Sequence, residues 1–450
     1  MGKTTLSRKR TTPKEGYSAL WKTEEYWAVW LGVAVILLAI ILFYQKNTLL
    51  TWLVLKVPHY NDFKIAIQYI TDHISALLVL YLFFLCLFGL PIKALKQKMW
   101  PFALGFTVLF ILSVGITVLG SWEVMRKYNI ETPVLALLVG LILGNIVRTP
   151  SWMSNALKTD FYVKVGIVLL GASLPITLIL QAGFTAFAQA TIIAIATFMT
   201  IYWTATRFFG LDNRFAATLA AGGSICGVSA SIAIGGAVKA EKKQVSIAIS
   251  LVVMWSIVMI FVLPFAISLL EIAPGPAGAW IGTAALADAP GMAAAAAINE
   301  QAIKTFTLMK VVGRDMFIGV WCFIMALFSV TTWEKRYVGS KPDAAEIWIR
   351  FPKFVLGFMI ASIIVTVLTA FADSSMNKDI STYIISPIVE LRNWTFIFTF
   401  LSIGLTSRFR ELTSIGWRPF AAFTTGILIN VPLGYLLSVI VMGSYWMTVR

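Results

Sequence analysis

Charged side chains are scarce in this sequence. Of its 450 residues 13% are charged and 59% are hydrophobic, and its mean hydropathy is +0.84. About a quarter of the residues of a typical soluble domain are charged, so a soluble globular protein is excluded. The composition predicts an all-α polytopic membrane protein. Apolar runs, mostly near the roughly 20 residues that cross a bilayer, occur at 26–45, 74–95, 101–121, 132–147, 162–181, 184–206, 244–270, 305–333, 353–371, 390–407 and 416–441.

Cysteine and histidine are also rare. The three cysteines, Cys86, Cys226 and Cys322, lie in apolar segments without metal-ligand spacing, which argues against disulfides and structural zinc. The two histidines, His59 and His73, flank a polar loop. A histidine-based catalytic or metal centre within the membrane is therefore excluded.

Signatures of enzymes are missing as well. No GxxxxGK sequence occurs, so the chain has no P-loop with which to use ATP. No nucleophile motif stands at a useful spacing from a base. We therefore expect a protein that is not an enzyme and has no cofactor, apart from a coupling proton or sodium ion.

Positive charge is present, with a net charge of +15, but it is spread between the apolar runs. It forms no basic patch with interleaved aromatic residues, so the expected partner is the lipid bilayer and not nucleic acid. The segment before Tyr26 is basic, and no small-residue cleavage site follows the first apolar run. These features predict a multi-pass protein of the inner (cytoplasmic) membrane with its N-terminus in the cytoplasm. We also expect a tight turn at 181–183, between two helices.

The most informative stretch is 213–239. Its middle, 222–231, holds three glycines and three serines, a composition that favours a break between two short helices. Broken backbone is tolerated at membrane depth only where protein or a watery cavity surrounds it. The stretch is therefore a candidate binding site. Close packing of small residues is the structural alternative.

A second interrupted piece, 276–303, has its expected tip at 288–291. Each piece either crosses the membrane or returns as a re-entrant hairpin, and the basic residues after 213–239 favour the hairpin. An arm of about 10 residues would be roughly 15 Å long, which reaches the bilayer midplane.

Internal repeats indicate the architecture. A shift of 233 residues aligns 171–174 with 404–407 and 183–188 with 416–421, and the paired helices are expected to run in opposite directions. A weaker, alanine-rich match aligns 226–234 with 290–298. These matches predict inverted repeats, at about 132–271 and 276–441, in a core of 99–450 that follows a two-helix extension at 1–98.

Several motifs together resemble those of the YeiH-like family of proposed sulfate exporters. They are Ile225 to Ala230, Leu169 to Leu174, Lys310 to Arg314, Ile403 to Thr406 and Gly416 to Pro419. The resemblance covers about 101–440. It implies membership of the cation/proton antiporter and anion transporter superfamily, whose crossing-helix core competes with the hairpin interpretation. It also implies a sulfate-like or sulfonated anion as the substrate.

One position departs from the family pattern. The resemblance implies a histidine near the second tip in some members, whereas Ala287 and Asp288 stand there in this sequence. A coupling role for that histidine is therefore not carried over.

The candidate site combines helix ends with polar side chains. A half-helix that begins at the midplane offers free N–H groups and a positive dipole end to an anion. The residues we expect to bind the substrate are Ser224, Cys226, Gly227, Ser229, Ser231, Pro290, Gly291 and Arg314. Cys226 also suits a packing role.

Four charged residues, Asp288, Lys310, Arg314 and Asp315, lie in an apolar context near the second tip. Lys310 and Arg314 are four residues apart and so share a helix face, which we expect to pair with the anion or with Asp288. Asp288 and Lys310 are the candidate coupling residues. Snorkelling of 310–315 to an interface is the alternative.

These features favour a secondary transporter that exports a small anion, sulfate or sulfonate-like, by alternating access. A cation/proton antiporter that uses Asp288 and a non-transporting membrane sensor or binding protein remain the alternatives. A homodimer is one oligomeric state that the sequence allows.

Overall fold

The computed structural model describes residues 19–47, 49–55, 57–127, 132–147, 149–318, 320–321, 324–325, 351–407 and 416–449. Helices joined by loops make up this part of the chain, and no strand occurs in it. Seven described helices are long and apolar enough to cross a membrane, and shorter apolar helices lie at 134–146, 228–237 and 354–370. The predicted class, an all-α polytopic membrane protein, is confirmed. The end of the predicted 305–333 helix lies outside the described residues.

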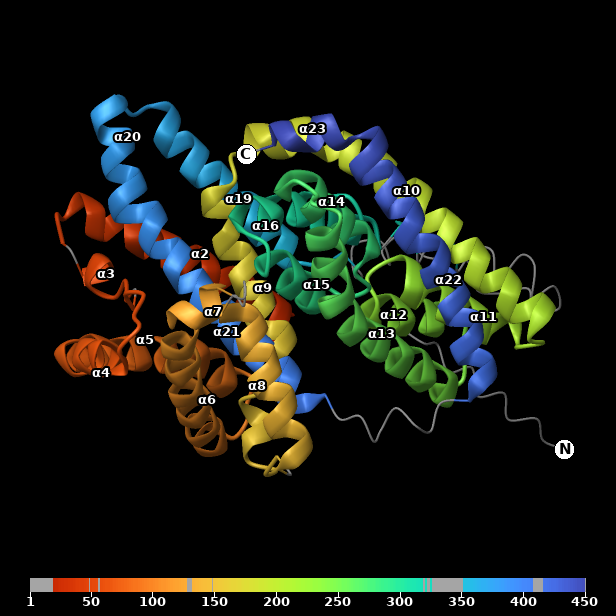
Figure 1. The fold of residues 1–450 in the computed structure, drawn as a ribbon, viewed down its shortest axis with the longest axis horizontal. Helices are drawn as coiled ribbons and strands as arrows, with labels where there is room; N and C mark the ends of the chain where they lie inside the picture. The colour runs from red at the N-terminus through yellow and green to blue at the C-terminus, as the bar shows by residue number, and fades with distance from the viewer. Residues whose placement is uncertain are drawn as a thin grey trace, which may run out of the picture.

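The helices form two groups (Figure 1). The outer group contains α1 (Ala19–Lys22), α2 (Glu24–Tyr44), α3 (Leu49–Trp52), α4 (Phe63–Asp72), α5 (Ile74–Ala94), α6 (Met99–Gly120), α7 (Glu123–Lys127), α8 (Thr132–Ile146), α9 (Thr159–Leu170), α19 (Phe354–Ala370), α20 (Ser374–Ile380) and α21 (Ser386–Thr406). The hairpin group contains α10 (Ile176–Trp203), α11 (Asn213–Ser224), α12 (Val228–Ala237), α13 (Lys242–Leu269), α14 (Pro274–Ala284), α15 (Asp288–Ala296), α16 (Glu300–Thr307), α22 (Trp417–Tyr435) and α23 (Gly443–Thr448).

Short 3-10 and π-helical segments extend several of these helices. The 3-10 segments are Met153–Asn155, Gly171–Ser173 and Asp315–Phe317, and the π-helical segments are Thr204–Phe208, Leu308–Val312, Ser381–Ile385 and Leu436–Val441. The π-helical segments therefore follow α10, α16, α20 and α22.

The predicted turn at 181–183 is wrong. Helix α10 runs without a break through Gly183, and the chain instead turns at Leu174 and Pro175, between α9 and α10. A proline disfavours helical backbone at the residue before it and cannot donate an N–H group to the preceding turn. A single glycine inside an apolar helix costs only about 1 kcal/mol, so the proline decides where the helix ends.

The two interrupted pieces are both helical hairpins. In the first, α11 and α12 are antiparallel: Gly222 lies against Ser231, Thr218 against Gly235, and Arg214 near its base donates to the carbonyl of Lys239 over 3.5 Å. In the second, α14 and α16 both begin beside α23, so α15 must return the chain to that end of the molecule. Gly275 touches the carbonyl of Trp446, and Gln301 Nε2 donates to the carbonyl of Val449 over 2.8 Å.

Helices α10 and α22 lie side by side and antiparallel along one edge of the molecule (Figure 1). Asn430 donates to Thr197 Oγ1 over 2.9 Å, and these two residues are separated by the 233-residue shift found in the sequence. The Phe209 and Trp417 rings, 5.6 Å apart, place the start of α22 near the base of the first hairpin. Because α23 follows α22 and holds the base of the second hairpin, the two hairpins enter from opposite ends of α22.

Close backbone contact joins α21 to α8 in the outer group. A Cβ atom on Gly404 would lie 2.5 Å from the backbone nitrogen of Leu141 and 2.6 Å from Gly140 Cα. Membrane helices can approach this closely only where small residues line the contact. In the same group, α2 is tied to the rest by the ion pairs of Glu24 with Lys158, at 2.6 Å, and of Glu25 with Lys164, at 3.2 Å.

We predict that Gly404→Ala lowers the free energy of unfolding by about 1–3 kcal/mol, because the added methyl group would overlap backbone atoms that cannot move aside separately. Thermal unfolding of the detergent-purified protein measures the change. Gly115→Ala is the matched control, because a Cβ atom there meets nothing within 4 Å. Equal stability of the two variants would contradict the prediction.

Candidate functional site

The tips of the two hairpins touch in the interior. Gly227 has φ +69°, and a Cβ atom on it would lie 2.6 Å from the carbonyl oxygen of Leu286 and 2.9 Å from Val252 Cγ1. Both the backbone conformation and the space therefore require glycine. Gly227 is the N-cap of α12, and Leu286 directly precedes Ala287, the N-cap of α15. The second arms of the two hairpins thus begin next to each other.

Arg314 holds the ends of the two first arms. Its guanidinium donates to the carbonyl oxygens of Gly282 (3.0 Å), Thr283 (2.7 Å), Ala285 (3.3 Å) and Ser224 (2.9 Å). The last carbonyls of a helix have no partner within the helix and carry the negative end of its dipole. Arg314 is only 3% exposed. A single buried cation therefore donates to carbonyl oxygens at the C-terminal ends of both α11 and α14.

Lys310 lies at the same junction and is fully buried. Its ammonium group donates to the carbonyl oxygen of Ile225 over 2.9 Å. It also lies 3.6 Å from Asp288 Oδ1 and 3.3 Å from Asp315 Oδ1. The predicted pairing of Lys310 with Asp288 is thus present, and the burial of Lys310 and Arg314 excludes the snorkelling alternative.

Asp315 is the site residue to which the sequence assigned no role. Its carboxylate is 3% exposed, and within the described part of the chain neither oxygen has a hydrogen-bond donor. Among the described residues Asp315 forms an ion pair with Lys310, and Lys310 also pairs with Asp288. The sequence placed Asp315 in the charged cluster, but nothing local showed that it would compete with Asp288 for one ammonium group.

The N-terminal ends of α12 and α15 are open by comparison. Neither N-cap residue, Gly227 or Ala287, makes a side-chain capping hydrogen bond, and Asp288 stands in the first turn of α15. The first backbone hydrogen bonds across these ends are donated by Ser231 and Gly291, which leaves the preceding N–H groups of each first turn without an intrahelical acceptor. Such an end attracts an anion through its N–H groups and its dipole. Ser229 lies in the first turn of α12 and is exposed.

Several predicted binding residues have packing roles here. Ser224 Oγ donates to the Ala220 carbonyl of its own helix over 2.7 Å, and the buried Ser231 faces Gly222 across the first hairpin. A Cβ atom on Gly291 would lie 2.6 Å from the Phe306 ring.

The remaining predicted residues divide between the two tips. Cys226 is 8% exposed, and Pro290 lies half-buried in the first turn of α15. Arg314, predicted to bind substrate, donates to carbonyl oxygens through both terminal nitrogens, whereas its Nε has no hydrogen-bond partner among the described residues. Ser229 and Asp288, the latter with 22% of its side chain exposed, are the predicted polar side chains left accessible at the tips.

Comparisons with known proteins agree on the family to which the chain is similar. The model of a family described as "Conserved hypothetical protein 698" matches residues 104–423. The UPF0324 membrane protein NE0724 of Nitrosomonas europaea is 31% identical over 89% of this chain and 91% of its own length. The UPF0324 membrane protein RB9488 of Rhodopirellula baltica is 32% identical over 80% of this chain, which spans 66% of that relative.

The UPF0324 inner membrane protein YeiH of Escherichia coli is 24% identical over 74% of this chain and 92% of its own length. No solved structure matches the chain. The family resemblance seen in the sequence motifs is confirmed.

We predict that Arg314→Lys destabilises the protein by about 2–5 kcal/mol, although the charge is kept. A lysine lacks the planar fork that reaches four carbonyls, and each buried hydrogen bond to a charged group contributes roughly 1.5–3 kcal/mol. Thermal unfolding tests this, with Arg418→Lys as the control because Arg418 is exposed. A small, equal change in both variants would show that Arg314 does not hold the tips together.

Proposed function

The chain belongs to the UPF0324 family of membrane proteins, described as conserved hypothetical protein 698, and we propose that it is a secondary active transporter and not an enzyme. The proposed cargo is a small anion, sulfate or sulfonate-like, which is exported by alternating access. We propose that the protein lies in an inner membrane, the location given in the name of the Escherichia coli relative. The N-terminus is proposed to face the cytoplasm.

The observation that carries the proposal is the junction of the two hairpin tips. Arg314 and Lys310 occupy the C-terminal ends of the first arms, so these ends are already neutralised by side chains. The N-terminal ends of α12 and α15 start side by side without caps among the described residues. Free N–H groups beside the accessible hydroxyl of Ser229 suit an oxyanion, because they donate hydrogen bonds without adding another full charge.

Opposite entry of the hairpins supports alternating access. We infer that α8, α9 and α10 repeat as α19, α21 and α22 with inverted orientation. The Thr197–Asn430 contact between antiparallel helices supports this inference, as does the equivalent close packing of Gly171 on Phe358 and of Gly404 on Gly140. In transporters with inverted repeats, substrate sites lie near the midplane between the halves.

The charged cluster supports coupling to a proton. Lys310 is shared by Asp288 and Asp315, so one ammonium group faces two carboxylates in a buried site. One ammonium group balances the charge of only one carboxylate, so a proton bound at this site would balance the other. We infer that Asp288, the more exposed of the two, exchanges this proton with water, and that Lys310 and Asp315 hold it in the site.

The proposal predicts saturable flux of radiolabelled sulfate into proteoliposomes. Ser229→Ala should raise the KM for sulfate about tenfold, since one hydrogen bond to a charged ligand is worth roughly 1.5–3 kcal/mol. Ser250→Ala is the control, because Ser250 Oγ donates to the Ser246 carbonyl of its own helix. Flux that does not saturate, or an equal KM in both variants, would contradict the proposed site. Retained sulfate binding without any flux would favour the sensor or binding protein.

A second candidate, cation/proton exchange, is favoured by the same two carboxylates. It predicts that a sodium or potassium pulse dissipates a preformed pH gradient in proteoliposomes, and that Asp288→Asn abolishes the response. For the anion transporter, Asp288→Asn should instead leave sulfate exchange intact while removing its acceleration by a pH gradient. A dye that reports internal pH, read alongside sulfate uptake, separates the two functions.

A further inference from the structure

Two cavities lie where the base of the second hairpin meets the outer group. Each has a volume of about 460 Å³. One is lined by Asn299, Ile303 and Asn393, and the other by Lys304 and Thr366. Glu300, the first residue of α16, lines both cavities. Glu300 therefore borders both spaces.

Glu300 forms a two-pronged ion pair with Arg392 of α21. Arg392 Nη1 lies 2.8 Å from Glu300 Oε1, and Nη2 lies 2.7 Å from Oε2. Arg392 is 1% exposed, whereas the Glu300 side chain is 43% exposed. Paired N–H···O bonds of this kind fix both distance and orientation, and are among the stronger polar contacts in proteins. The contact joins the hairpin group to the outer group.

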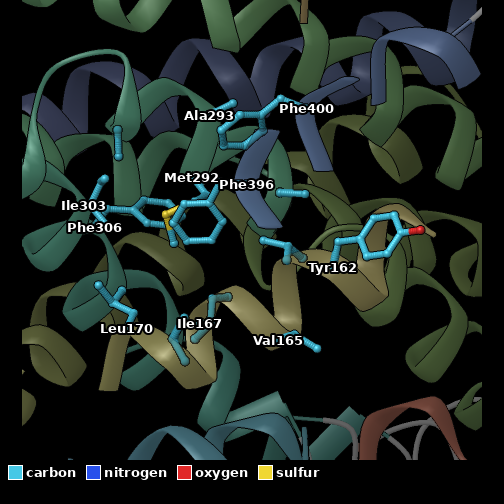
Figure 2. Close-up of a cluster of buried hydrophobic side chains, with 14 of the residues drawn as sticks. Tyr162, Val165, Ile167, Leu170, Met292, Ala293, Ile303, Phe306, Phe396 and Phe400 are labelled. Carbon is cyan, nitrogen blue, oxygen red and sulfur yellow. The ribbon is translucent and has the colours of Figure 1, made fainter. Parts of the chain in front are cut away.

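An apolar cluster adjoins this ion pair, because Phe396 of the cluster lies beside Arg392. Figure 2 shows Met292 of α15, Phe306 of α16 and Phe396 of α21 meeting at its centre. These three side chains are between 0% and 2% exposed. The guanidinium carbon of Arg392 is 5.7 Å from the centre of the Phe396 ring, one helical turn away on the same face of α21. The ion pair and the cluster thus share α16 and α21.

The cluster separates the cavities from the hairpin tips. Met292 lies one turn beyond Asp288 on α15, and Ile303, which is 6% exposed, marks the boundary between the first cavity and the cluster. Neither Asp288 nor Ser229 lines either cavity. The packed side chains of α15, α16 and α21 thus lie between the first cavity, which Ile303 and Phe396 line, and Asp288 on α15.

We propose that Glu300 and Arg392 form a latch that closes the route from these cavities to the hairpin tips, with Met292, Phe306 and Phe396 as its apolar seal. Release of the ion pair frees the start of α16 from α21 and lets the hairpin group separate from the outer group along the seal. The apolar contacts beneath are non-directional, so the latch supplies the fixed orientation of the closed state. This inference rests on the proposed transport function for its purpose.

The reactivity of a cysteine placed in the seal tests the latch. Met292→Cys is introduced into the full chain with Cys86→Ser, Cys226→Ala and Cys322→Ser, and the rate of its modification by a charged methanethiosulfonate reagent is measured in nanodiscs. Glu300→Gln keeps the shape of the side chain but removes its charge, and should raise the rate about tenfold or more by populating the open state. The charge-swapped double variant, Glu300→Arg with Arg392→Glu, should return the rate toward that of the parent, which carries Met292→Cys with the native Glu300 and Arg392.

Glu24→Gln is the matched control. Glu24 forms a close ion pair with Lys158, but both residues belong to the outer group, so the modification rate should not change. The latch is refuted if Glu300→Gln reacts at the parent rate, if the charge swap reacts as fast as Glu300→Gln, or if Glu24→Gln raises the rate equally. Should Glu300→Gln fail to fold, Arg392→Lys, which keeps the charge but loses the second prong, takes its place with the same expected direction.

Sulfate flux of the unmodified protein separates this inference from the proposed function. Saturable flux with no effect of Glu300→Gln on modification refutes the latch alone. The expected modification pattern in a protein that moves no sulfate or cation refutes transport and leaves the latch as a conformational contact.

Discussion

Two half-helices end inside this molecule, and their terminal carbonyl groups need donors that lipid cannot supply. Arg314 provides them to α11 and α14 at once, and Lys310 reaches the next carbonyl of the first hairpin. The geometry suits arginine, because its guanidinium presents several donors in one plane and keeps its charge when buried. The charge is in turn offset by two negative helix ends, so a buried cation and two broken helices stabilise each other.

The two sides of the junction differ in their chemistry. The C-terminal ends of the first arms are filled by the protein's own side chains, whereas the neighbouring N-terminal ends of α12 and α15 lack caps among the described residues. The backbone N–H groups that can attract an anion therefore lie on one side of the junction. The carboxylates of Asp288 and Asp315 lie near it and share Lys310, so a change in the charge of either carboxylate is felt at the carbonyl-bound ammonium group as well.

Hydrophobic contact and polar contact have different roles between the two helix groups. The cluster around Met292 and Phe396 buries apolar surface, which stabilises any arrangement that keeps the surfaces together. The Glu300–Arg392 pair is directional and is satisfied only in one arrangement. Two residues that are 92 positions apart in the chain thus fix how the hairpin group is aligned with the outer group.

The sequence by itself determined the membrane class, the two breaks and the charged cluster, because hydropathy and backbone propensity depend on residues that are close in the chain. It placed one turn wrongly, at 181–183, where the proline at position 175 outweighed Gly183. Only the tertiary structure decided that Arg314 caps helices, that Gly291 packs on Phe306 and that Asp315 competes for Lys310. These contacts join segments that are brought together by folding, so no local pattern of residues encodes which partner each side chain meets.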